Sequence, residues 1–203
     1  YRRWNAVRVP CQSGPVFSAL EDWVDRYENI AIAGMNYKFF CTDHAPMKPF
    51  VKNCHVYSNL LILNEAPFQW RGRYNEDTDL CLQVLAGGWC TVQFNTFLID
   101  KATTGTMKGG NSDELYQGDG RLKMARSLER MWPKVVETKR RFGRPQHVIR
   151  NAWRKFDTPL KRRTDIDWDS IAKTNEYGMS LKEVSPIKSK WIKKLLKKSK
   201  GKK

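Results

Sequence analysis

The chain lacks the features of membrane-spanning and secreted proteins. None of its apolar runs approaches the length needed to cross a bilayer, so no membrane-spanning segment is predicted. Its cysteines are odd in number and have no close pairs, and the N-terminal residues do not form a secretory signal, so a disulfide framework is not expected. We therefore expect free thiols and a reducing, cytoplasmic compartment. The cysteines are Cys11, Cys41, Cys54, Cys81 and Cys90.

Acidic side chains are scarce in the last third of the chain. Residues 138–203 hold 21 basic and 6 acidic residues, whereas residues 1–137 hold 16 basic and 15 acidic residues. Almost all of the net charge of +16 therefore belongs to the C-terminal third. This division predicts a near-neutral catalytic or binding core with a cationic extension, and it favours a polyanionic partner.

Internal repeats are absent, and helix-like and strand-like hydrophobic patterns alternate. An acidic turn, a helix, a glycine stop at Gly87-Gly88 and an alternating strand follow one another, which is typical of an α/β unit. Residues 102–120 contain five glycines among small polar residues and predict a long loop. The expected helices cover residues 17–28, 77–85 and 122–136, and the expected strands cover residues 29–34, 55–63 and 91–99.

The densest group of charged residues lies at the start of the second expected helix. Arg71 and Arg73 come just before the carboxylates of Glu76, Asp77 and Asp79. Such carboxylates can cap a helix by accepting hydrogen bonds from its first N–H groups. Asp77 and Asp79 also have the D-x-D spacing, which can hold a divalent cation and phosphates. The residues alone leave both interpretations open.

A resemblance to a known family starts from this turn. The string NEDTDLCLQVLAGGWCTVQFNTFLI resembles the E-D-x-D-L and A-G-W element in the acceptor half of family-2-like glycosyltransferases with the GT-A fold. With NIAIAGMNYKFF, NCHVYSNLLILN, TMKGGN and GRPQHVIRNAWRKF, it resembles the TET/JBP-associated glycosyltransferases, phage and eukaryotic proteins proposed to glycosylate hydroxymethylated pyrimidines in DNA. The resemblance implies a GT-A-like, Rossmann-like α/β domain over residues 1–157, of which this chain holds the acceptor side. Residues 158–203 are then a basic, partly helical or disordered extension.

The resemblance also implies roles for the acidic turn. Asp77 would be the catalytic base of an inverting transfer, and Glu76 beside it would shape the acceptor pocket. A nucleotide-sugar, expected to be a UDP-sugar, would be the donor, and Mg²⁺ or Mn²⁺ would be the divalent cation if the transfer uses one. The family's D-x-D strand lies upstream of this turn, and no such acidic cluster precedes Glu76. We therefore expect the nucleotide-binding half to precede Tyr1.

Several residues are candidates for contact with the donor. Where related enzymes often place a metal-binding histidine, this sequence has Asp100-Lys101, and Lys101 can pair with a phosphate. Asp79 is the candidate metal ligand, from its D-x-D spacing with Asp77. The loop over residues 103–111 could cover a diphosphate, although an ordinary flexible loop explains it as well. The donor-side candidates are Lys101, Lys108, Gly109, Gly110, Asn111, Arg71 and Arg73.

The basic C-terminal third predicts contact with DNA. The tail carries an apolar helical face within a lysine-rich segment, which also suits a membrane surface, a protein partner or plain solvation. The resemblance favours DNA, with His147 touching a phosphate or packing under the basic face. The expected DNA-binding residues are Arg144, His147, Arg150, Arg154, Lys161, Arg162 and Arg163.

A zinc site is not favoured, because Cys41, His44, Cys54 and His55 lack a standard ligand spacing. Core cysteines and a loop histidine explain these residues better. The function expected from the whole sequence is glycosyl transfer to a hydroxymethylated base such as hydroxymethylcytosine, in the host cytoplasm if a bacteriophage encodes the chain. Two alternatives remain: a non-catalytic nucleic-acid-binding protein, and a metal-dependent nuclease that uses the carboxylates of the acidic turn.

Overall fold

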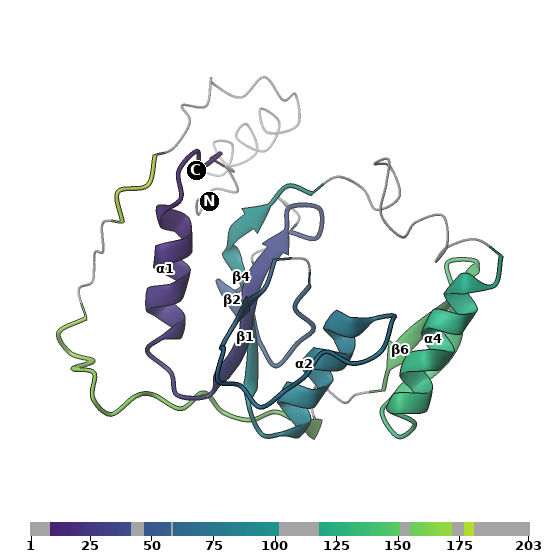
Figure 1. The fold of residues 1–203 in the computed structure, drawn as a ribbon. Coiled ribbons are helices and arrows are strands. Elements are labelled where there is room, and N and C mark those ends of the chain that lie inside the picture. The colour runs from purple at the N-terminus through teal and green to yellow at the C-terminus, as the bar shows by residue number, and fades with distance from the viewer. Residues whose placement is uncertain are drawn as a thin grey trace, which may run out of the picture.

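The computed structural model describes residues 9–41, 47–57, 59–101, 118–150, 155–171 and 177–180. It has a mixed α/β architecture, as the sequence predicts (Figure 1). Within this part of the chain, no helix is long and apolar enough to span a membrane. The helices are α1 (Pro15–Val24), α2 (Glu76–Ala86) and α4 (Gly120–Met131). The strands are β1 (Ile30–Tyr37), β2 (Phe50–Lys52), β3 (Leu61–Ile62), β4 (Cys90–Ile99), β5 (Val136–Arg141) and β6 (Arg144–Ile149).

Four strands form a sheet in the order β2-β4-β1-β3. The central strands β1 and β4 are parallel, and the short outer strands β2 and β3 are antiparallel to them. Helix α2 leads into β4 through Gly87-Gly88, so the C-terminus of α2 lies near the amino end of β4. Because the helix runs back along the sheet in the opposite direction to β4, its N-terminus lies toward the carboxyl ends of β1 and β4. In open α/β sheets this edge is where ligands bind.

The two faces of the sheet are covered by different helices. Leu20 of α1 packs with Ala33, Met35 and Val92 on one face. Leu80 and other residues of α2 pack against the opposite face, because successive strand side chains point to opposite sides of a sheet. The result is a three-layer arrangement in which helices α1 and α2 enclose the sheet.

Helix α4 and the β5–β6 hairpin pack on the outer side of α2. Leu82 of α2 is fully buried against Leu128 of α4 and Val136 of β5. The helix expected over residues 122–136 is therefore too long, since α4 ends at Met131. The residue before a proline is disfavoured in the helical conformation, and Trp132 precedes Pro133, so the chain turns there and enters a hairpin that the sequence did not predict.

The strand expected over residues 55–63 is also mostly wrong. Only Leu61–Ile62 pair with β1, and β2 forms upstream of this segment. The chain bends at Asn53, which has a positive φ of 55°. Beyond it, the backbone of Cys54 and Val56 is hydrogen-bonded by side chains of β4 and α2 rather than by a neighbouring strand.

Gly34 in β1 is expected to be intolerant of any side chain. A Cβ at this position would lie 2.0 Å from the carbonyl oxygen of Asn59 and 2.7 Å from Cγ1 of Val56. Gly34→Ala should lower the free energy of unfolding by about 3 kcal/mol, at the upper end for overpacked cores, because backbone must move to relieve the contact. Chemical denaturation measures this loss. Gly14→Ala is the control, since nothing lies within 4 Å of its Cβ, and equal stability losses in both variants would contradict the prediction.

Candidate functional site

Asp77 lies in the first turn of α2 and is partly exposed. Its Oδ1 accepts a hydrogen bond from the backbone N–H of Thr78 at 2.6 Å, and the Thr78 hydroxyl lies 3.3 Å from the same oxygen. Asn75, which precedes the helix with a φ of 53°, donates from Nδ2 to the carbonyl oxygen of Met124 in α4 at 2.9 Å. The capping interpretation is therefore correct in part for Asp77, and α4 holds the start of the helix.

His55 faces Asp77 from the segment between β2 and β3. Its Nε2 lies 3.4 Å from Oδ2 of Asp77 and 3.2 Å from the hydroxyl of Thr78. The backbone N–H of Cys54 donates to the Thr91 hydroxyl, and the N–H of Val56 donates to Sγ of Cys81. Side chains from β4 and α2 therefore fix the chain immediately before and after His55.

The thiol of Cys81 is a structural group. Burial raises its pKa to about 12, so it stays protonated and donates to the carbonyl oxygen of Val56. The five cysteines are all unpaired in the structure, which agrees with the free thiols expected from their number and spacing.

The charge of Asp77 is stabilised by its neighbours. Burial raises the pKa of Asp77, but the hydrogen bond and charge of His55 and the two Thr78 donors together lower it more. The net pKa lies below the ordinary value of 3.8, so the carboxylate is ionised at neutral pH. Because the pKa is lowered by folding, Asp77 stabilises the folded state above its unfolded pKa and loses this effect as the pH falls through the folded value.

Replacing His55 is expected to raise the pKa of Asp77. His55→Phe keeps a ring beside Tyr57 but removes the charge and the donor, so that burial, the largest single influence on the carboxyl group, is opposed only by Thr78. Titration of the Asp77 carboxyl carbon by NMR should show a pKa below 3.8 in the native protein and a higher one in the variant. An unchanged titration would show that His55 does not control this charge.

The charges of this site also influence His147 of β6. Burial lowers its pKa below the ordinary 6.5, the charge of His55 lowers it again, and Asp77 acts in the opposite direction. His147 is half-buried, whereas Arg144 and Arg150, at the two ends of β6, are exposed. The structure thus separates His147 from the exposed arginines with which the sequence grouped it.

A chain of aromatic rings extends from His55 to the protein surface. The ring of Tyr57 lies 5.0 Å from His55, 4.9 Å from Tyr37 and 6.0 Å from Phe40. Phe39 follows at 5.3 Å from Phe40, and these two phenylalanines are 84% and 53% exposed. We call these four residues, Tyr37, Phe39, Phe40 and Tyr57, the aromatic cluster. It lies at the carboxyl end of β1 and connects the Asp77 site with solvent.

Asp79 is fully buried and has a structural position. Its carboxylate accepts two hydrogen bonds from Arg71, at 2.9 and 3.0 Å, and one from Gln83 at 2.9 Å. The indole N–H of Trp132 donates to the same carboxylate at 2.6 Å. Arg71 also lies over the Trp132 ring. Asp79 therefore ties α2 to the end of α4, and its oxygens are engaged by donors rather than turned toward a cation.

The described residues do not form a metal site. Among them, no three side chains of His, Cys, Asp or Glu lie close enough together to hold an ion. Asp79, whose oxygens accept hydrogen bonds from Arg71, Gln83 and Trp132, does not offer its carboxylate to a metal ion. A metal-dependent nuclease that used the acidic turn would therefore lack one of its three carboxylates. His44, which the sequence pairs with Cys41, lies outside the described residues.

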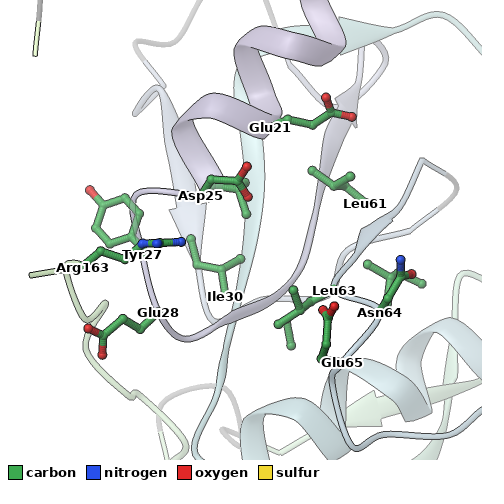
Figure 2. Close-up of a pocket in the computed structure, with 13 residues that line it drawn as sticks. Glu21, Asp25, Tyr27, Glu28, Ile30, Leu61, Leu63, Asn64, Glu65 and Arg163 are labelled. Atoms are coloured by element: carbon green, nitrogen blue, oxygen red, sulfur yellow. The ribbon is translucent and has the colours of Figure 1, made fainter. Parts of the chain in front are cut away.

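A cavity of about 470 Å³ lies between α1 and β3, and Figure 2 shows side chains that line it. Asp77 is not among its lining residues. Its lining includes the carboxylates of Glu21, Asp25, Glu28 and Glu65. The basic group in its wall, Arg163, is paired with Asp165. A cavity with this charge repels a diphosphate, so it does not suit a nucleotide-sugar.

The structure brings together only some of the residues expected at the donor and acceptor. Glu76 adjoins Asp77 and is exposed, and Lys101 lies with its Nζ 5.5 Å from the Tyr37 ring of the aromatic cluster. Arg73 is exposed and lies over the Tyr74 ring. The remaining donor candidates, Lys108, Gly109, Gly110 and Asn111, lie outside the described residues.

The expected DNA-binding residues fall into two groups. Arg144 begins β6, and Arg150 follows the strand and pairs with Glu137. The segment of Lys161, Arg162 and Arg163 runs beside the turn before β1, at the amino ends of the parallel strands, as backbone hydrogen bonds with Glu28 and Arg26 show. This places the second group at the sheet edge opposite Asp77. Arg154 and the lysine-rich residues 181–203 lie outside the described residues.

Sequence reasoning did not predict the partnership of His55 with Asp77. The string NCHVYSN indicated part of this site, because His55 and Tyr57 are two residues apart. An extended backbone places two such side chains on the same face. Nothing local linked this face to the acidic turn, which follows it by about twenty residues.

A comparison with protein families gives a match over the first half of the chain. A family model described as TET-Associated Glycosyltransferase matches residues 1–110, which is more than half of the 203 residues. The matched segment includes β1 to β4, His55, Asp77 and the aromatic cluster, and it ends before α4. No curated protein and no solved structure matches the chain.

Proposed function

The chain belongs to the TET-associated glycosyltransferases, and from that membership we propose that it transfers a sugar to the hydroxymethyl group of a pyrimidine base in DNA. It is a glycosyltransferase enzyme, and such enzymes use a nucleotide-sugar donor. The acceptor, the UDP-sugar donor, the GT-A-like arrangement and the inverting course of the reaction are parts of the proposal.

The observation that carries the proposal is the ionised, partly exposed carboxylate of Asp77 beside His55. A general base must be deprotonated and within hydrogen-bond reach of the proton that it removes. Thr78 and His55 keep Asp77 ionised at neutral pH, and a carboxylate with its several acceptor positions can bind one more donor. The attacking hydroxyl is that donor in the proposed reaction.

The proposed step is a single displacement. Asp77 accepts the proton of the hydroxymethyl group as its oxygen forms a bond to C1 of the sugar. The bond from C1 to the diphosphate breaks on the opposite face, and its electron pair leaves with the nucleotide. Attack from the face opposite the leaving group inverts the configuration at C1.

The aromatic cluster supports a planar acceptor. Bases that have left a nucleic-acid stack are commonly held against aromatic side chains. Phe40 and Phe39 are exposed, and the ring of Tyr57 lies between Phe40 and His55, which is beside the proposed catalytic base Asp77. Lys101 lies at the same sheet edge, and we propose that it interacts with a phosphate of the donor.

The proposal is tested by incubating the protein with UDP-sugars and oligonucleotides that contain one 5-hydroxymethylcytosine. Mass spectrometry should show the addition of one sugar to this oligonucleotide, because its hydroxyl is the proposed nucleophile. The same oligonucleotide with cytosine should remain unmodified. Sugar transfer to both oligonucleotides, or hydrolysis of donor without transfer to any hydroxymethylated pyrimidine, would contradict the proposed acceptor.

A further inference from the structure

The tip of the β5–β6 hairpin exposes a phenylalanine within a group of basic residues. Phe142 is 89% exposed, although its ring is large and apolar. Arg141 and Arg144 are paired across the two strands on either side of it, and Lys139 and Arg140 precede it. All four basic residues are exposed. The tip therefore offers positive charge for phosphates and an apolar ring to the same partner.

The turn gives Phe142 an unusual backbone conformation. Phe142 has a φ of 50° and Gly143 has a φ of 74°, so both residues of this tight turn lie in the left-handed region. Hairpin turns of this kind favour Asn-Gly or Asp-Gly, because a bulky residue is strained at positive φ. A phenylalanine in this position lowers the stability of the fold, and its exposed ring makes no buried contact that would offset this loss. Strain of this kind is concentrated at functional sites.

The base of the hairpin packs against α4 and α2. Val136 and Ile149, at the far end from the tip, pack with Leu128 of α4. Between base and tip, His147 pairs with Thr138, and the pKa of His147 is influenced by the charges of His55 and Asp77. The hairpin thus extends from a packed base, past His147, to the exposed ring at its tip.

We infer that the β5–β6 hairpin inserts Phe142 into the base stack of duplex DNA while its arginines contact the backbone phosphates. Apolar side chains that enter a duplex in this way unstack neighbouring bases, and flanking basic residues hold the backbone. The inference rests on the proposed function, because a base within a duplex must leave the stack to meet Asp77. Phe142 then occupies the space beside the displaced base.

Phe142→Asn separates this role from a structural one. Asparagine suits the positive φ and removes the ring, so the variant should melt at a higher temperature than the native protein. The probe is a duplex with 2-aminopurine next to a 5-hydroxymethylcytosine, whose fluorescence rises when the stack opens. We expect the rise on binding the native protein to be lost with Phe142→Asn and kept with Phe142→Leu, which retains an apolar side chain. A full rise with Phe142→Asn would overturn the inference.

The phosphate contacts are tested by the salt dependence of duplex binding. Arg141→Ala should weaken binding severalfold and reduce the slope of log K against log salt by about 1, because one phosphate contact is lost. Lys48→Ala is the matched control, since this exposed basic residue precedes β2 of the four-stranded sheet, outside the hairpin, and should leave the slope unchanged. Equal effects of the two substitutions would overturn the placement of DNA on the hairpin.

Single-stranded acceptors distinguish this inference from the proposed function. Phe142→Asn should reduce sugar transfer to the duplex at least tenfold and leave transfer to the same single strand nearly unchanged, because no stack needs to be opened. Equal losses on both acceptors would overturn the insertion role. A native protein that opens the duplex but transfers no sugar to either acceptor would contradict the proposed function and leave the insertion supported.

Discussion

Asp77→Asn is expected to reduce sugar transfer by about 10²- to 10⁴-fold, the range for loss of a general base. The amide cannot accept the proton of the attacking hydroxyl. Its oxygen can still accept the hydrogen bond from the Thr78 N–H, so the first turn of α2 should stay in place. The rate of transfer at saturating acceptor measures the effect, and circular dichroism with thermal melting checks the fold.

Asp100→Asn is the control for the loss of one carboxylate near the same sheet edge. Asp100 follows β4, its side chain is 74% exposed, and it pairs with Lys38 at 2.6 Å. This variant should retain a rate close to that of the native protein. If Asp77→Asn transfers sugar equally well, Asp77 is not the base. If it unfolds while Asp100→Asn does not, capping is its main role.

Asp79→Ala is expected to cause a large loss of stability. The substitution removes a fully buried carboxylate that accepts four hydrogen bonds, and it leaves the donors of Gln83 and Trp132 without their acceptor. Removing one partner of a buried ion pair costs about 3–5 kcal/mol. We expect about 3 kcal/mol here, because the Arg71 side chain is 48% exposed and can turn to water.

Denaturant unfolding of the native protein and of Asp79→Ala measures the loss of stability. Asp119→Ala is the matched control: Asp119 pairs with Lys123 at 3.0 Å, and its side chain is 64% exposed. Exposed pairs of this kind contribute about 0–1 kcal/mol, so this variant should unfold almost as the native protein does. A loss below about 1 kcal/mol for Asp79→Ala would show that the buried contacts do not tie α2 to α4 as the structure indicates.

Features with a local cause were predictable from the sequence. Helix α2 was expected over residues 77–85 and covers Glu76–Ala86, because acidic residues mark its start and Gly87-Gly88 ends it. Strand β4 was expected over residues 91–99 and is Cys90–Ile99, since its alternation of side chains is clear. The acidic turn also carried the family resemblance, which the matching family model confirms. The assignment of Asp77 as catalytic base stays a prediction.

Contacts between distant segments were decided by the tertiary structure. Local spacing does not distinguish Asp77 from Asp79, yet one faces His55 at the surface and the other is buried against Trp132, 53 residues away. The start of the β5–β6 hairpin was missed for a related reason, because Val136 continues the helical spacing of α4, whereas in the structure it begins β5 and packs against Leu82 of α2. Charge and periodicity follow from the order of residues alone. The pairing of a carboxylate with a histidine or a tryptophan depends on which elements the folded chain brings together.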